Sequence, residues 1–216
     1  MRLLAISILL ACAAIAAAAQ TPQAAADGDA AYMKVVTERS AKIVATLGIE
    51  DTLKFARVRD IIARQYRDLN AIHDERSGKV KALKAQGGSD ADAKIRAAEV
   101  EADAKLYARH NAYVAKLASE LAPEQVDKVK DGMTYGVAPL TYRVHCEMIP
   151  TLTDEQKRYI LAALLEAREY AMDAESSDKK HEWFGKYKGR INNYLSAQGY
   201  DLKKERAAWE KRKIKN

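Results

Sequence analysis

Residues 51–120 read DTLKFARVRDIIARQYRDLNAIHDERSGKVKALKAQGGSDADAKIRAAEVEADAKLYARHNAYVAKLASE. Apolar side chains recur along this stretch at spacings of mostly three and four, which places them on one face of an α-helix. The segment QGGSD at residues 86–90 forms a turn. The apolar face consists of Phe55, Val58, Ile62, Leu69, Ile72 and Leu83 before the turn, and of Ile95, Leu106, Tyr113, Leu117 and Leu121 after it. Two long helices joined by one short turn predict an antiparallel helical hairpin over about residues 50–120.

The rest of the chain is also rich in helix-forming residues. Only four prolines occur in 216 residues, and no segment alternates with the period of a strand. A first helix is expected from about Ala31 to Leu47, ended by Gly48, whereas residues 131–142 are the least helical part. Further helices are expected from Pro123, over residues 142–148, over residues 153–173, from Ser176 and from Asp201. We predict an all-α fold, a helical bundle in which the long hairpin packs with shorter C-terminal helices, in a single domain of residues 32–216.

The first twenty residues, MRLLAISILLACAAIAAAAQ, have the pattern of a secretory signal, with a positive charge at Arg2, an apolar run and small residues before Gln20. We predict a signal peptide at residues 1–19, a linker at residues 20–31, and a periplasmic or secreted location in a Gram-negative-type cell envelope. The apolar run is too short for a transmembrane segment. Cleavage before Cys12, which would leave a lipid anchor on that residue, is an alternative that stays open.

The chain carries 36 Lys and Arg residues against 30 Asp and Glu residues, a formal net charge of +6. The two signs are interspersed along the predicted helices, which is typical of a solvated surface and does not indicate a nucleic-acid partner. Only the tail at residues 203–216 is locally basic. Because either cleavage takes Cys12 out of disulfide chemistry, Cys146 has no partner for an internal disulfide, and the fold must be held by its core.

No motif of a known catalytic chemistry is present. The four histidines, at positions 73, 110, 145 and 181, never fall at HxxxH or HExxH spacing, so we predict no metal site. The patterns GxSxG, GxGxxG and the phosphate-binding loop are absent, and we expect no cofactor. Carboxylate pairs are common on the predicted helix surfaces, and they neither support nor exclude acid–base hydrolysis of glycosides.

Two helix surfaces are the candidate binding regions. In residues 181–193, HEWFGKYKGRINN, the rings of Trp183, Phe184 and Tyr187 share one arc and predict core packing. The opposite side holds Gly185 and Gly189, which would allow close approach of another helix or of a ligand, and both interpretations stay open. The candidate binding residues are Tyr135, Tyr142, His181, Lys186, Lys188, Arg190, Asn192 and Asn193, together with Arg59, Tyr66, Asn70 and His73 on the polar margin of the long helix.

Three segments carry a family resemblance. They read RVRDIIARQYRDLNAIHDER at residues 57–76, KDGMTYGVAPLTYRVHCEMIPTLTDEQK at 130–157 and KKHEWFGKYKGRINNYLSAQGYDLKKE at 179–205. The chain resembles the bacterial domain-of-unknown-function 3826 family over about residues 32–209. The resemblance implies a secreted or periplasmic helical protein of bacteria that digest plant or algal polysaccharides, and it brings no established activity.

A weaker similarity is to the LTxxQ periplasmic chaperones related to Spy. It rests on LTDEQ at residues 152–156 and on the imperfect LAPEQ at residues 121–125. Those chaperones are small, basic helical hairpins without an enzyme site. This chain is longer, and the motif at residues 181–193 has no counterpart in them.

We expect an accessory protein of polysaccharide metabolism that binds a glycan or an envelope protein and has no established catalytic activity. The binding groove would combine the loop at residues 135–142, the helix face at 181–193 and the margin at 59–73. An uncharacterised polysaccharide lyase or hydrolase is the first alternative. A Spy-like periplasmic chaperone with an exposed apolar concave face is the second. Full burial of Trp183, Tyr187 and Arg190 would contradict the binding hypothesis.

Overall fold

The structure is a computed structural model that describes residues 22–215. These residues form 8 α-helices and one short 3₁₀ turn, with no strand among them. The elements are α1 (Pro22–Val44), η1 (Ala45–Leu47), α2 (Thr52–Gln86), α3 (Ala91–Ala118), α4 (Pro123–Met133), α5 (Val137–Met148), α6 (Asp154–Met172), α7 (Ser177–Ala197) and α8 (Leu202–Lys215). The predicted all-α fold is therefore confirmed. Within the described range, no helix combines the length and apolar composition needed to cross a membrane.

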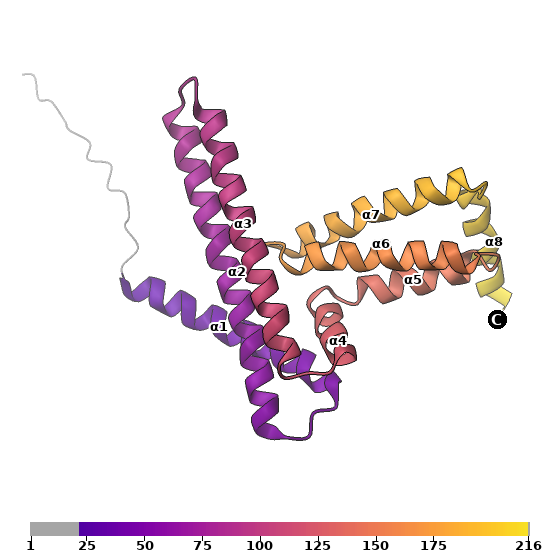
Figure 1. Ribbon diagram of the computed structural model, residues 1–216, viewed down its shortest axis with the longest axis horizontal. Coiled ribbons are helices and arrows are strands. Elements are labelled where there is room, and N and C mark those ends of the chain that lie inside the picture. Colours follow the sequence, from indigo (N-terminus) through magenta and orange to yellow (C-terminus); the bar gives the residue numbers. More distant parts are fainter. Residues whose placement is uncertain (1–21, 216) are drawn as a thin grey trace, which may run out of the picture.

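Helices α2 and α3 form the predicted hairpin, antiparallel and side by side (Figure 1). Asp51 caps the start of α2, where its carboxylate accepts hydrogen bonds from the backbone N–H groups of Leu53 and Lys54 at 2.8 and 3.1 Å. The connecting turn contains Gly87 and Gly88, whose φ angles of 64° and 103° suit glycine. The hairpin predicted at about residues 50–120 is confirmed.

The outer half of the hairpin is held together differently from the inner half. Between residues 74 and 112 the only buried residue is Ala102. Lys79 and Lys105 each contact both Glu75 and Glu101, with nitrogen–oxygen distances of 2.8 to 3.0 Å. Residues 74–112 therefore form a projecting two-helix arm, here called the outer arm, whose helices are joined largely by ion pairs (Figure 1).

Helix α1 begins at Pro22, so the described part of the linker expected at residues 20–31 is helical instead. Residues 24–31 are mostly alanine, the strongest helix former, and proline is tolerated in a first turn. The predicted end of this helix is confirmed, because α1 passes into η1, which stops at Gly48 with a φ of 68°. The signal peptide expected at residues 1–19, and with it Cys12, lies outside the described residues.

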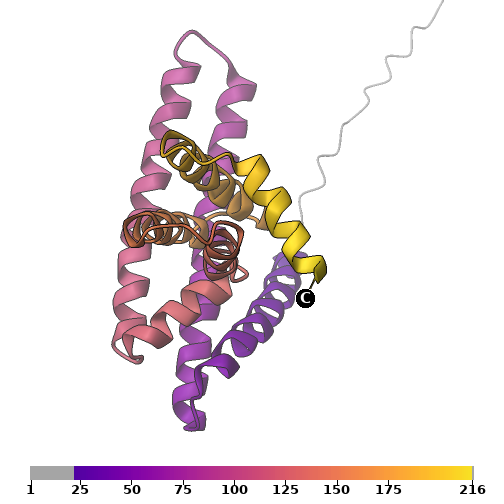
Figure 2. The ribbon, with the colours of Figure 1, turned by 90° about the vertical axis from the view of Figure 1, so that its right-hand side faces the viewer.

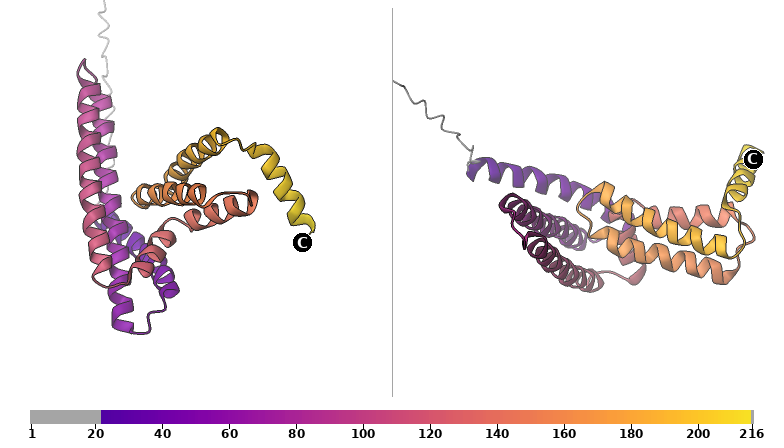
Figure 3. Two further views of the ribbon diagram at one scale, coloured as in Figure 1. Left: turned by 45° about the vertical axis from the view of Figure 1, so that its right-hand side comes forward. Right: turned by 90° about the horizontal axis from the view of Figure 1, so that it is seen from above.

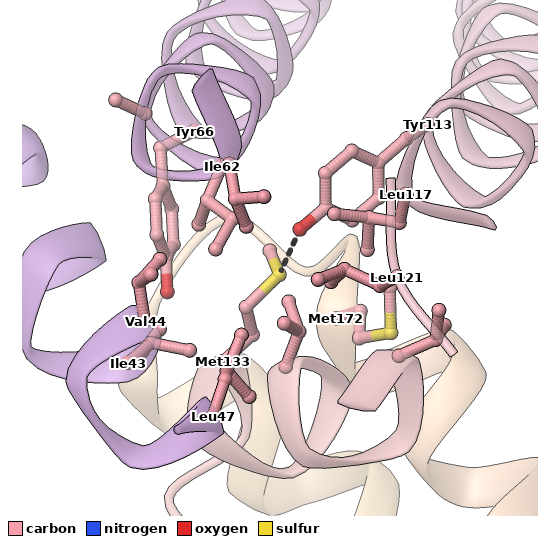
Figure 4. Close-up of a cluster of buried hydrophobic side chains, with 14 of the residues drawn as sticks. Ile43, Val44, Leu47, Ile62, Tyr66, Tyr113, Leu117, Leu121, Met133 and Met172 are labelled. Atoms are coloured by element: carbon pink, nitrogen blue, oxygen red, sulfur yellow. Dashed lines mark hydrogen bonds between the residues drawn. The ribbon is translucent and has the colours of Figure 1, made fainter. Parts of the chain in front are cut away.

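Helices α1 to α4 enclose the first of two hydrophobic cores (Figure 4). The hydroxyl of Tyr113 donates a hydrogen bond to Sδ of Met133 at 3.1 Å and joins α3 to α4. Helix α4 also lies close to α1: the helices approach so closely at Gly132 that an added Cβ would stand 3.0 Å from side-chain atoms of Ile43. Met172, at the end of α6, reaches into this same core. The C-terminal end of α6 is thereby anchored in the first core.

Helices α5, α6 and α7 enclose the second core, and α8 crosses their far end (Figure 3). Phe184 and Tyr187 of α7 are buried in it, as predicted from their common arc, whereas Trp183 of the same arc is half-buried. Ile191 of α7 is buried there as well. Helix α6 begins with the predicted capping box, in which Thr153 and Gln156 accept hydrogen bonds from each other's backbone N–H at 3.3 and 2.9 Å. Figure 2 views α5 to α7 nearly end-on, in front of the hairpin that they project from.

The break between α4 and α5 is shorter than the irregular stretch expected at residues 131–142. Helix α5 begins at Val137 and not near Tyr142, because Pro139 stands in its first turn, where a missing N–H costs no helical hydrogen bond. The break itself contains Tyr135 and Gly136 in left-handed conformations, with φ angles of 59° and 65°. Among the described non-glycine residues only Tyr135 has a positive φ. Two left-handed residues in succession turn the chain sharply from the first core to the second.

Candidate functional site

A cavity of about 1220 Å³ lies between the outer arm of the hairpin and the turn that joins α6 to α7. Both the hairpin and the α6–α7 region contribute to its walls, and Trp183, which packs against the second core, is part of the lining. From the hairpin it is lined by His73, Arg76, Ser77, Val80, Lys81, Lys84, Glu99, Asp103, Leu106, Tyr107, His110 and Asn111, and from α6, the turn and α7 by Glu169, Tyr170, Asp173, Ala174, Glu175, Lys179 and Trp183.

An aromatic pair lines the α6–α7 side of the cavity. The rings of Tyr170 and Trp183 are stacked, with centroids 4.6 Å apart and planes inclined by 16°. Tyr170 is 48% exposed, and the Lys186 ammonium lies 5.0 Å from the centroid of the Trp183 ring. On the hairpin side, Tyr107 of α3 is 72% exposed. The cavity therefore offers flat aromatic surfaces that remain open to solvent.

The pair continues as an aromatic strip along the seam between α6 and α7. The ring centroid of Tyr187 lies 6.3 Å from that of Tyr170, and the Arg190 guanidinium lies 4.7 Å from the centroid of the Tyr187 ring. Farther from the cavity, the rings of Tyr159 and Tyr194 stack with centroids 3.9 Å apart. Because α6 and α7 are antiparallel, these contacts follow one another along the seam. Tyr187 itself is buried, so the ring of this strip that is open to a long ligand leaving the cavity is Tyr159, which is 37% exposed.

A cluster of charged side chains closes the cavity where α6 meets the hairpin. Nδ1 of His110 lies 2.7 Å from the Asp173 carboxylate, and Nε2 lies 3.3 Å from the Glu169 carboxylate. Hydrogen bonds to Asp173 and then to Glu169 outweigh burial and raise the pKa of His110 to about 9. Burial acts to raise the pKa of Glu169, but hydrogen bonds from His110 and Lys130 lower it to about 2. His110 is therefore a fixed cation between two carboxylates and not a free base.

His73 of α2 stands beside this cluster and is 7% exposed. Its Nε2 lies 2.7 Å from the backbone oxygen of Asp173. Its Nδ1 has no hydrogen-bond partner, and neither has Oδ1 of Asp173, although both atoms are buried. The Glu175 carboxylate, which pairs with Arg76, lies 3.7 Å from Nδ1 of His73. The inner end of the cavity thus contains two buried polar atoms whose hydrogen bonding is incomplete.

Of the binding residues predicted from the sequence, only His73 lines this cavity. Lys186 and Arg190 lie beside the aromatic strip. Tyr135 and His181 are brought together elsewhere as stacked rings, with centroids 5.7 Å apart. The groove predicted around Tyr135 and His181 stays a prediction, since the structure does not join it to the cavity.

The remaining predicted residues are dispersed. Tyr66 is buried, and the guanidinium of Arg39 lies 5.5 Å from its ring centroid. Arg59 and Asn70 donate hydrogen bonds to Asp60 and Asp74 of their own helix, at 2.8 and 2.7 Å. Tyr142 is half-buried against the second core, whereas Lys188, Asn192 and Asn193 are exposed on α7.

Helix α7 was expected to have one buried arc and one approachable face. Tyr187 is buried, Trp183 is half-buried and Arg190 is exposed, so the full burial that would contradict binding does not occur. A Cβ added at Gly185 or Gly189 would meet no atom within 4 Å. These two glycines therefore do not serve close packing of helices, and their face is open.

Sequence reasoning missed most of the cavity. Tyr107, His110 and Asn111 occur at spacings of three and four on α3, and this local pattern could have marked one polar face of that helix. Asp173 and Glu175 carry no such signal, because they lie in the turn that follows α6. Among the side chains that the structure describes, no three His, Cys, Asp or Glu groups are arranged to hold a metal ion.

Comparison with known proteins gives a match to one family model. The model described as a protein of unknown function (DUF3826) matches residues 33–215. A search of curated proteins finds no match. The matched range contains every residue that lines the cavity and the aromatic strip.

Proposed function

This chain belongs to the DUF3826 family, whose function is unknown. From the geometry of the chain itself, we propose that it binds a glycan in the cavity between the outer arm and the α6–α7 turn. The protein would act in the cell envelope, periplasmic or secreted, as an accessory protein of polysaccharide metabolism. Catalysis is not part of this proposal.

The stacked pair of Tyr170 and Trp183 is the observation that carries the proposal. The faces of a pyranose ring present C–H groups, which are apolar and pack against flat aromatic rings, whereas its edge carries hydroxyls that need polar partners. The cavity offers both kinds of surface, because the aromatic pair faces it and the polar groups of His73 and Asp173 lie at its inner end.

The size of the cavity favours an oligosaccharide over a single sugar. Pockets for small molecules usually measure about 300–1,000 Å³, and this one measures about 1220 Å³. Past the cavity, along α6 and α7, the aromatic strip is exposed at Tyr159, whereas Tyr187 is buried. Lys186 and Arg190, both predicted binding residues, lie along the strip, where they would contact hydroxyls or acidic substituents of the outer sugar residues.

The proposal is tested by glycan arrays and titration calorimetry with fragments of pectic, other plant and algal polysaccharides. Trp183→Ala and Tyr170→Ala should each weaken binding about tenfold, since loss of a stacked aromatic contact costs on the order of 1.5 kcal/mol. Tyr135→Ala is the matched control, because it removes an exposed ring outside the cavity. New reducing ends or unsaturated products, measured in the same samples, would identify the lyase or hydrolase alternative.

Two results would contradict the proposal. Absence of binding to every glycan fragment, with a folded protein, would remove the glycan function. Loss of binding in Tyr135→Ala and His181→Ala, but not in Trp183→Ala, would move the site to the groove predicted from the sequence.

A chaperone function is the second candidate, and the apolar side chains of the cavity favour it. Val80, Leu106 and Tyr107 line the hairpin side, opposite Tyr170 and Trp183. An apolar concave surface of this kind would hold unfolded segments of other proteins. The test is whether the protein suppresses aggregation of heated citrate synthase at near-stoichiometric ratios, and whether Tyr107→Ser abolishes that suppression.

A further inference from the structure

We propose that the inner end of the cavity is a subsite for an uncharged, hydroxyl-bearing sugar residue, whose hydroxyls donate hydrogen bonds to Nδ1 of His73 and Oδ1 of Asp173. This inference rests on the proposed glycan-binding function, and it specifies the chemistry of the sugar residue that lies at the inner end of the cavity.

The tautomer of His73 follows from its contact with the main chain. Nε2 lies 2.7 Å from the backbone oxygen of Asp173. A carbonyl oxygen can only accept, so Nε2 carries the hydrogen and donates it. In the neutral ring, Nδ1 is then left with a lone pair and acts only as an acceptor. This acceptor belongs to a side chain that is 7% exposed and that lines the cavity, and it has no partner.

Asp173 supplies the second acceptor. Its Oδ2 lies 2.7 Å from Nδ1 of His110, and its backbone oxygen accepts from His73. Its Oδ1 is buried and has no partner. The same residue therefore fixes both histidine rings and leaves one carboxylate oxygen for a ligand.

Two unpartnered acceptors specify the group that can complete them. Hydroxyls donate hydrogen bonds, whereas carboxylates and sulfates have no hydrogen to donate. The carboxylates around this end, Asp173, Glu169 and Glu175, would also repel an anion. The cations near them are already paired: His110 and Lys130 with Glu169, and Arg76 with Glu175. Lys179, which lines the cavity from α7, pairs with Glu182. The free lysines Lys81 and Lys84 lie farther along the outer arm. Acidic substituents therefore fit the outer part of the cavity and uncharged hydroxyls fit the inner end.

Entry to the subsite requires the movement of one side chain. The Glu175 carboxylate stands 3.7 Å from Nδ1 of His73, in the turn between α6 and α7. Its side chain is 33% exposed and its ion pair with Arg76 lies near the surface, where such pairs contribute little stability. A sugar hydroxyl can therefore displace Glu175 and take its place beside the ring. Glu175→Ala is accordingly expected to retain binding.

The experiment compares matched neutral and acidic ligands by titration calorimetry. The probes are cellotetraose and β-1,4-linked mannotetraose, each set against its counterpart with the primary hydroxyls oxidised to carboxylates. The neutral tetrasaccharides should bind at least tenfold more tightly. His73→Gln, which keeps a side-chain N–H for the Asp173 backbone oxygen and lacks the Nδ1 acceptor, should weaken neutral binding about tenfold. His181→Gln, an exposed histidine outside the cavity, is the control and should change nothing.

A second variant replaces a hydrogen-bond acceptor of the subsite with a donor. In Asp173→Asn, one acceptor oxygen becomes an N–H donor, so the preference for the neutral over the carboxylated tetrasaccharide should fall. Equal or tighter binding of the carboxylated probes to the wild-type protein, or unchanged binding by both variants, overturns the subsite and leaves the glycan function standing. Failure of every neutral and carboxylated probe to bind overturns the glycan function itself, and the subsite with it.

Discussion

Nδ1 of His110 lies 2.7 Å from the carboxylate of Asp173, and this contact joins the hairpin to the end of α6. The imidazole also meets Glu169, one turn earlier on α6, at 3.3 Å. Apart from Met172, the first core takes no buried residue from beyond α4 among the residues that the structure describes. The hairpin therefore meets the end of α6 at a charged histidine, and this contact should depend on the protonation of His110.

The free energy of unfolding should decrease as the pH rises from about 6.5 to about 9. The pKa of His110 is raised from 6.5 to about 9 in the folded protein, so its contribution is complete below 6.5 and is lost as the pH passes 9. Urea denaturation at intervals across this range measures the effect. His110→Gln should flatten the pH dependence relative to the wild type, whereas His181→Gln should not. A parallel decrease in His110→Gln would contradict the assignment.

Lys180→Met should destabilise the fold by about 1–3 kcal/mol. Nζ of this buried lysine donates hydrogen bonds to the backbone oxygens of Ala171 and Met172, at 2.9 and 2.8 Å, and so completes the end of α6. Methionine has a similar length but no donor, which leaves two buried acceptors unsatisfied. Urea denaturation measures the loss, with Lys188→Met on the exposed face of α7 as the control, expected within about 0.5 kcal/mol of the wild type. Equal stability of both variants would show that water can replace the ammonium.

The same lysine gives a second, opposite dependence on pH. Burial lowers the pKa of Lys180 from 10.5 to about 8. Because the folded value lies below the ordinary one, stability should rise as the pH increases from about 8 to 10.5. Lys180→Met removes this rise, and denaturation curves of wild type and variant at pH 8 and 10 would reveal it. A wild-type slope that matches the variant's slope is the contrary result.

Gly189→Ala should stabilise the protein by about 0.5–1 kcal/mol, because alanine is the better helix former and no atom stands within 4 Å of the added Cβ. Gly136→Ala should instead destabilise it by about 1–2 kcal/mol, because its φ of 65° places a Cβ against the following carbonyl oxygen. Thermal and urea denaturation distinguish the two substitutions. Destabilisation by Gly189→Ala would mean that another surface, such as a second protein, packs closely on this face in solution.

Arg168→Lys should cost about 1–3 kcal/mol, although it conserves the charge. Arg168 is 4% exposed and donates from two guanidinium nitrogens, one to Asp131 and one to Asp127. A lysine ammonium cannot span both carboxylates, so one hydrogen bond between α4 and α6 is lost. Arg158→Lys, on the exposed side of α6, is the matched control and should leave the denaturation midpoint unchanged. An unchanged midpoint in both variants would show that one carboxylate suffices.

The hairpin could be predicted from the sequence because its signals are local. Val58, Ile62 and Leu117 recur with the helical period, and this period reports which face of each helix is buried. The capping box of Thr153 and Gln156 is likewise contained in four residues. The linker predicted up to residue 31 is wrong from Pro22 onward, because the alanines of this segment favour a helix over an irregular chain.

The cavity could not be predicted in the same way. It forms where residues distant in sequence meet, since Asp173 is 100 positions from His73 and 63 from His110. Which histidine keeps a free nitrogen depends on these contacts and not on its neighbours in the chain. Tyr135 and His181, both predicted binding residues, stack on each other apart from the cavity, and a groove around them stays a prediction.

The outer arm gives the cavity one wall that is unlike the other. The wall formed by α6 and α7 packs on the second core, whereas the wall formed by the outer arm is held together by the surface ion pairs of Lys79 and Lys105 with Glu75 and Glu101. Dissolved salt screens such exposed pairs over about 10 Å at 0.1 M. Amide hydrogens of residues 74–112 should therefore exchange with solvent earlier than those of α6, and faster still as the ionic strength increases. The width of the cavity would then depend on the salt concentration, because the outer arm can move while the wall formed by α6 and α7 stays in place.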